Sequence, residues 1–126
     1  MIRRMLAIAM LAGVTVGALV IEALHAQSQP PVFVVFDAEI KDPRYQPFAM
    51  TAAREVAAQG GKFIVAGATP ETLVGTGTGL RIVSISQWAD KEAARRWFNS
   101  EPMKAVREAQ EKYTTTRLFI VEGRTP

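Results

Sequence analysis

The order of strand and helix patterns constrains the fold of this chain more than any other feature of its sequence. Apolar or alternating runs at residues 32–40, 62–67, 80–88 and 114–122 predict four strands. Longer segments with apolar residues at helical spacing separate the first strand from the second and the third from the fourth. This β-α-β-β-α-β order predicts a ferredoxin-like α+β fold, in which a four-stranded antiparallel sheet carries two helices on one face.

Short local signals predict where the helices begin and end. Asp42 followed by Pro43 is typical of a capped helix start, and the glycines at 60–61 are typical of a left-handed stop. Asp90 is expected to cap the second helical segment, which residues 100–102 bend or restart because they include a proline. Large side chains at helical spacing in that segment are expected in the core: Trp97, Phe98 and Met103.

The stretch between the second and third predicted strands is rich in glycine. Residues 71–74 read as a short extra strand, and the Gly-Thr-Gly-Thr-Gly sequence at 75–79 reads as a flexible connection. A phosphate-binding glycine loop would be followed directly by a helix, whereas a strand pattern follows here. We therefore expect a connecting loop without a phosphate site.

Residues 1–28 have the parts of an export signal. Two arginines precede an apolar run at residues 5–21, and cleavage after Ala26 and cleavage after Ser28 are alternatives. The run is shorter than the roughly 20 residues that a membrane-spanning helix needs. We expect the leader to be removed and residues 29–126 to form a single exported domain, periplasmic or secreted. An uncleaved leader would instead anchor the protein in the membrane.

Charge and composition exclude several classes of function. The formal net charge is +3, with both signs scattered along the chain, so no basic stripe suited to nucleic acid is present. The chain has no cysteine, and its single histidine, His25, belongs to the leader. The exported domain therefore lacks imidazole and thiolate ligands, and its sequence has no dinucleotide-binding fingerprint. We expect neither a metal nor a cofactor.

Six short motifs occur together between residues 32 and 123. They are Asp42-Pro43 with Tyr45, Gly60-Gly61-Lys62-Phe63, Trp88 with Asp90 and Glu92-Ala93-Ala94, Trp97-Phe98-Asn99-Ser100, Glu111-Lys112-Tyr113, and Phe119 with Val121-Glu122-Gly123. As a set they resemble the bacterial family filed as domain of unknown function 1330, in the dimeric α+β-barrel superfamily. The resemblance implies a homodimer whose two sheets face each other and enclose a small cavity. It implies no particular reaction, because the superfamily includes oxygenases, isomerases, haem-dependent enzymes and ligand-sensing domains.

Asp37 is one candidate ligand-binding residue. It alternates with the apolar residues of the first strand and so projects from the face that a dimer would enclose. Buried there it could act as a base, because burial disfavours the charged form of a carboxyl. Alternatively it pairs with Arg117 or Arg81 on a neighbouring strand, and this is the outcome we expect, since structural ion pairs outnumber catalytic acids.

The third strand supplies the other candidates. Ser84, Ser86 and Trp88 alternate on one of its faces. Small polar groups beside an indole suit the wall of a pocket for an otherwise apolar ligand, although small packing residues are the commoner reason for serines at such positions. The predicted ligand-binding residues are therefore Asp37, Ser84, Ser86, Trp88 and Arg117.

These features favour an exported small-molecule-binding or stress-associated protein. The alternative is a cofactor-independent monooxygenase or isomerase that acts on a small, partly apolar substrate with Asp37 as its base. A third interpretation is an interaction module whose cavity is filled by its own Phe33 and Val35. The expected partners are a second copy of the chain and a small molecule, with no nucleic acid and with the membrane only if the leader is retained.

Overall fold

The computed structural model of the chain describes residues 29–77 and 79–125, and the predicted leader at 1–28 lies outside the described residues. Residues Pro31–Gly123 form one compact unit. Its elements are β1 (Val32–Ile40), the 3₁₀ helix η1 (Pro43–Tyr45), α2 (Gln46–Ala58), β2 (Lys62–Ala68), β3 (Leu80–Trp88), α3 (Lys91–Asn99), α4 (Glu101–Tyr113) and β4 (Thr114–Glu122). None of these described helices has the length and apolar character that crossing a bilayer requires.

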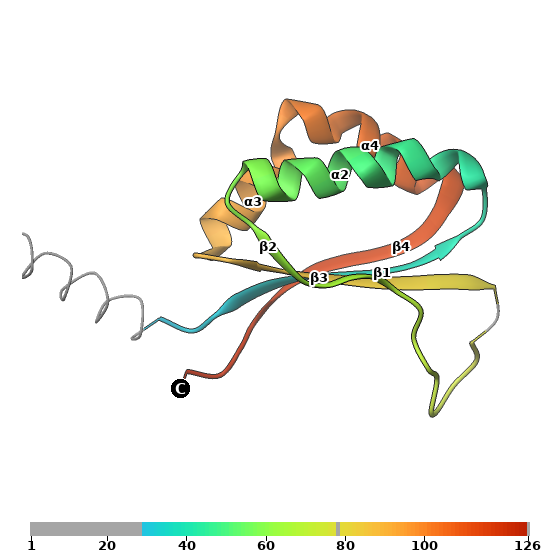
Figure 1. Cartoon of the computed structure of the whole chain (residues 1–126), viewed down its shortest axis with the longest axis horizontal. Coiled ribbons are helices and arrows are strands. Elements are labelled where there is room, and N and C mark those ends of the chain that lie inside the picture. The colour runs from blue at the N-terminus through green and yellow to red at the C-terminus, as the bar shows by residue number, and fades with distance from the viewer. Residues whose placement is uncertain (1–28, 78, 126) are drawn as a thin grey trace, which may run out of the picture. The chain divides into compact units, whose positions relative to one another are not determined.

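The strands form one antiparallel sheet in the order β2-β3-β1-β4. The three α-helices lie together on one face of that sheet, and the other face carries no helix (Figure 1). The ferredoxin-like fold predicted from the order of the elements is therefore confirmed. Because β1 and β3 are the central strands, their side chains alternate between the helix-covered face and the open face.

The hydrophobic core fills the space between the helices and the sheet. Trp97 and Met103 are buried there, as predicted. Phe98 is 36 % exposed, so its assignment to the core was wrong. Neighbouring residues on a helix point about 100° apart, so when Trp97 faces the sheet Phe98 turns toward its edge. The buried cluster is made of Val32, Val34, Val56, Trp88, Ala94, Trp97, Met103 and Val106.

The predicted helix boundaries are present. The Asp42 carboxylate accepts a hydrogen bond from the Arg44 backbone N–H, and the Asp90 carboxylate accepts one from that of Ala93. Gly60 ends the turn after α2 with φ of +94°. The second helical segment is broken at Ser100, whose extended backbone separates α3 from α4.

Residues 71–74 do not form the extra strand expected from their sequence. They lie in the connection between β2 and β3, where Leu73 and Val74 are almost fully exposed. This connection projects to the side of the sheet opposite the helices (Figure 1). Its backbone therefore has no neighbouring strand with which to pair, whatever the local preference of its residues.

Candidate functional site

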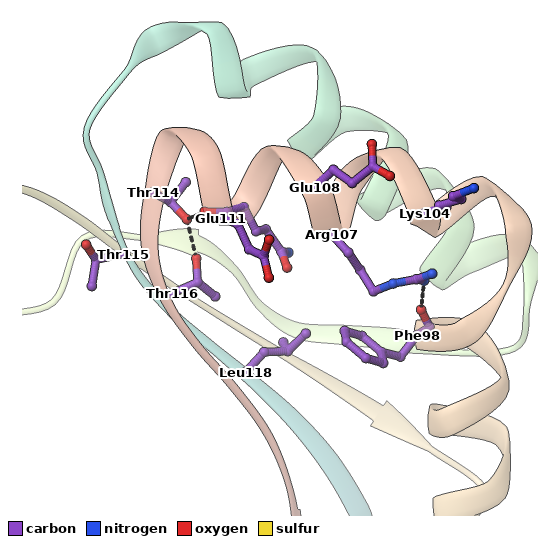
Figure 2. A pocket seen from close by; sticks show the side chains of 10 residues that line it. Phe98, Lys104, Arg107, Glu108, Glu111, Thr114, Thr115, Thr116 and Leu118 are labelled. Atoms are coloured by element: carbon purple, nitrogen blue, oxygen red, sulfur yellow. Dashed lines mark hydrogen bonds between the residues drawn. The ribbon is translucent and has the colours of Figure 1, made fainter.

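One hollow of the described unit is a groove at the β4 edge of the sheet, which we call the edge groove. It lies between α4 and β4, has a volume of about 750 Å³, and is shown in Figure 2. Charged groups and hydroxyls make up much of its wall. The lining residues are Phe98, Lys104, Arg107, Glu108, Gln110, Glu111, Thr114, Thr115, Thr116 and Leu118.

Several side chains of the edge groove already bond within the protein. The Arg107 guanidinium donates to the Phe98 carbonyl oxygen and lies over the Phe98 ring, 5.3 Å from its centroid. The Thr114 hydroxyl donates to the Gln110 carbonyl oxygen, 2.6 Å away, and also contacts the Thr116 hydroxyl. The remaining charged side chains are exposed to water and carry both signs: Lys104, Glu108 and Glu111. The edge groove is therefore a solvated surface, where exposed charges contribute little to binding.

A second hollow, the helix–sheet cavity, lies between α2 and the covered face of β2 and β3. Its volume is about 290 Å³, near the lower end of the range for small-molecule sites. Met50 on α2 is 55 % exposed and lines it, so the cavity reaches the surface along this helix. The lining residues are Val34, Phe36, Tyr45, Gln46, Ala49, Met50, Ala52, Ala53, Val56, Phe63, Ala66, Gly67, Ile82, Ser84, Ser86, Trp97 and Gln110.

The helix–sheet cavity exists because small residues face each other across it. On α2 the lining positions include Ala49, Ala52 and Ala53, and on β2 they include Ala66 and Gly67. The pairing of β2 with β3 also shifts register twice. Side chains this short cannot reach across the gap between a helix and a sheet, so space remains between two well-ordered layers.

Two serine hydroxyls line the cavity from β3. The Ser86 oxygen accepts a hydrogen bond from the Trp88 indole N–H at 2.8 Å, and the Ser84 oxygen accepts one from the Gly67 backbone N–H, also at 2.8 Å. A hydroxyl that accepts a bond still has its own proton to donate. Both serines can therefore offer a donor to the cavity.

Trp97 lines the helix–sheet cavity with one polar atom unsatisfied. Its side chain is 95 % buried and packs against Trp88, with 5.5 Å between the ring centroids. The Trp97 indole nitrogen is a buried side-chain polar atom without a hydrogen-bond partner among the described residues. Leaving a buried donor unpaired costs about 1–3 kcal/mol, and the core around Trp97 carries this cost.

Tyr45 is the one titratable side chain of the cavity lining. Burial raises the pKa of its phenol, an effect opposed by the hydrogen bond that the Gln110 amide donates to the phenol oxygen at 3.3 Å. Because its pKa is raised, Tyr45 stays neutral at physiological pH. Within residues 29–77 and 79–125, no three His, Cys, Asp or Glu side chains are grouped in a way that could hold a metal ion.

Residues 31–124 match the family described as domain of unknown function 1330 (DUF1330). The match spans the whole of the ferredoxin-like unit. The chain belongs to the DUF1330 family. No curated protein is similar enough in sequence to count as a match.

Solved structures share the fold of this DUF1330 protein at low sequence identity. SnoaB of Streptomyces nogalater, a cofactor-independent oxygenase, has a TM-score of 0.59 and 17 % identity, with 77 % of this chain and 96 % of that chain covered. A protein of unknown function from Rhodopseudomonas palustris has a TM-score of 0.57 and 15 % identity over 78 % and 85 %. A conserved protein from Methanosarcina mazei Go1 has a TM-score of 0.53 and 14 % identity over 79 % and 99 %. At these identities the likeness shows the fold alone.

The predicted ligand-binding residues are divided between the two faces of the DUF1330 sheet. Ser84 and Ser86 lie on the covered face and line the helix–sheet cavity. Trp88 lies on the same face but is buried beside Trp97 in the core and is not part of the lining. Of the predicted residues on the covered face, Ser84 and Ser86 therefore line the cavity, whereas Trp88 packs in the core beside it.

The remaining predicted residues lie on the open face. Asp37 and Arg117 are opposite each other on β1 and β4. The Asp37 carboxylate forms an ion pair with Arg81 at 2.9 Å, which confirms the preferred interpretation of this residue. The Arg117 guanidinium lies over the Phe119 ring, 5.2 Å from its centroid. The sheet separates these side chains from the helix–sheet cavity.

Sequence reasoning did not identify most of the cavity lining. Tyr45 and Trp97 were assigned to a family motif and to the core, although both line the cavity. The available signal was the recurrence of alanine along α2, at Ala49, Ala52 and Ala53, all of which line the cavity. A helix face whose apolar side chains are all short fills little of the gap to the sheet, and so indicates a space there.

We predict that Ser86→Ala lowers the free energy of unfolding by about 1–3 kcal/mol, because it leaves the buried Trp88 N–H without an acceptor. Ser84→Ala is the matched control, since the Gly67 N–H that it releases lies at an exposed position where water can replace the serine. Urea unfolding of both variants measures the difference. Equal losses of stability would contradict this account of Ser86.

Proposed function

We propose that this DUF1330 protein binds a small, largely apolar molecule in the helix–sheet cavity. The observation that carries the proposal is the cavity itself, in which apolar walls surround a few polar groups. Sites of this composition hold an apolar ligand by burial and orient it through a small number of hydrogen bonds. An accessory role in binding or stress response, as the sequence favoured, is consistent with such a site.

Binding is favoured over acid–base catalysis. A general base needs a titratable group within reach of the substrate, and the titratable group of the lining is the neutral Tyr45. Asp37, the base of the alternative hypothesis, is paired with Arg81 on the other face of the sheet. A cofactor-independent oxygenase or isomerase is therefore the second candidate, supported by the fold shared with SnoaB.

We predict that the protein binds tetralin or 1-tetralone, two-ring probes of apolar character, with 1:1 stoichiometry. Ala53→Phe should abolish this binding, because Ala53 is an exposed residue of the lining and a phenyl ring there occupies the cavity. Ala57→Phe places the same ring one turn further along α2, outside the lining, and should leave affinity unchanged. Isothermal titration calorimetry measures both. The absence of binding by either probe would overturn the proposed function.

We further propose that a second copy of the chain covers the open face of the sheet. That face combines the Asp37–Arg81 ion pair with apolar side chains, and an exposed apolar sheet face is typical of an interaction site. The β2–β3 connection, with its exposed Leu73 and Val74, projects to the same side and could add to the contact (Figure 1). The apolar residues in register on this face are Phe33, Val35, Val83, Ile85, Phe119 and Val121.

We predict that Val35→Asp dissociates the dimer, because it places a charge at the centre of the apolar open face. Ala105→Asp adds the same charge at an exposed position of α4, in the helical layer, and should leave the dimer intact. Light scattering coupled to size-exclusion chromatography measures the mass of each. A monomeric unmodified protein at micromolar concentration would contradict the proposal.

We propose, finally, that the protein is exported and loses its leader. The support is the short apolar run after two arginines and the small residues that follow it. N-terminal sequencing of the protein recovered from the periplasm should then begin at Gln27 or Gln29. Full-length chain retained in the membrane fraction would favour the anchor instead.

A further inference from the structure

We infer that the side chain of Gln110 limits how far a ligand reaches into the helix–sheet cavity, so that the cavity takes a compact apolar molecule rather than a long chain. The inference rests on the proposed function and adds the size class of the ligand to it. It follows from the position of Gln110 between two hollows and from the hydrogen bond that holds its amide there.

Gln110 belongs to the linings of both the helix–sheet cavity and the edge groove. It is the single residue that the two linings share among the described residues. It lies on α4 and is half-buried, between the buried core side of this helix and its exposed side. The two hollows therefore approach each other at Gln110, and this residue forms the wall between them.

The amide of Gln110 is anchored on the side of the helix–sheet cavity. It donates a hydrogen bond to the phenol oxygen of Tyr45 at 3.3 Å. Tyr45 is buried, and its ring stacks on that of Phe36, with 6.4 Å between the centroids. Both aromatic residues line the cavity and neither lines the edge groove. The amide is therefore directed toward the cavity rather than into the water of the edge groove.

The backbone around this contact is held in place as well. The Tyr113 carbonyl oxygen accepts hydrogen bonds from the backbone N–H groups of Lys41 and Asp42, at 2.9 and 3.1 Å. The Thr114 hydroxyl donates to the Gln110 carbonyl oxygen at 2.6 Å. These bonds tie the last turn of α4 to the segment that leads into η1, so the wall formed by Gln110 has a fixed support.

The space beyond Gln110 gives an apolar chain little to gain. The edge groove is solvated there and carries the exposed charges of Lys104, Glu108 and Glu111. At the other end of the cavity, beside the exposed Met50, further methylenes would lie in water. Burying one methylene raises affinity about fourfold. The affinity of a linear ligand should therefore rise with its length only until the cavity is full.

The test uses the linear alcohols from 1-butanol to 1-decanol, a neutral series that differs only in length. Calorimetry on the full chain should show affinity rising about fourfold per methylene and then levelling off within the series. Gln110→Ala removes the wall, so the rise should continue for about two further methylenes.

Two variants are matched controls. Gln46→Ala removes the other glutamine of the cavity lining, at the exposed start of α2, and should leave the length at which affinity levels off unchanged. Gln110→Met keeps an unbranched side chain of similar length without the amide, and should also leave that length unchanged, because its bulk still closes the cavity.

The outcomes separate the inference from the proposed function. If affinity levels off at the same length in Gln110→Ala as in the unmodified protein, or if either control shifts as far as Gln110→Ala, the inference is wrong and the cavity remains a binding site. Affinity that still rises at 1-decanol in the unmodified protein, or binding of the two-ring probes without any alcohol, would also overturn it alone. Binding of neither the alcohols nor the two-ring probes would overturn both. If Gln110→Ala does not fold, Gln110→Ser removes the same amide and decides the matter by the same measurement.

Discussion

The contact between the Trp88 and Trp97 indoles is the interaction on which the rest of this structure depends. Trp88 joins the end of β3 to the core, while Trp97 reaches the same place from α3. The chain before β2 passes so close that a Cβ on Gly61 would lie 2.6–2.8 Å from the Trp88 ring. The pair therefore holds α3 against the end of β3, beside the helix–sheet cavity that Trp97 lines.

The two faces of the sheet differ in what they contact. The covered face packs against the helices and leaves the helix–sheet cavity where α2 presents alanines. The open face combines apolar side chains with the Asp37–Arg81 ion pair, a composition suited to contact with another molecule. The proposed ligand site and the proposed dimer interface can thus coexist in about 90 residues, because successive residues of one strand serve opposite sides.

Hydrogen bonding within the covered face explains why a packed layer also offers a polar site. Ser86 accepts from Trp88 and so stabilises the core, yet its own proton remains available on the cavity side. Trp97 is buried by the same packing but its N–H finds no partner among the described residues. Such an unpaired donor is unfavourable, so the packing around Trp97 offsets its cost.

The succession of strands and helices along the chain, the caps at Asp42 and Asp90, and the division of β1 into an apolar and a mixed face could all be predicted from the sequence. Each depends on neighbours within a few residues, and periodicity reports it directly. The loop at 71–74 escaped prediction because pairing requires a second strand, whose position is not local information. Most of the cavity lining, apart from Ser84 and Ser86, escaped prediction for the same reason. Residue types alone determined that this domain carries no thiol or imidazole chemistry. The distance between α2 and β3 depends on contacts between residues that are far apart in the chain. That distance decided that Ser84, Ser86 and Trp97 share a cavity and that Asp37 does not.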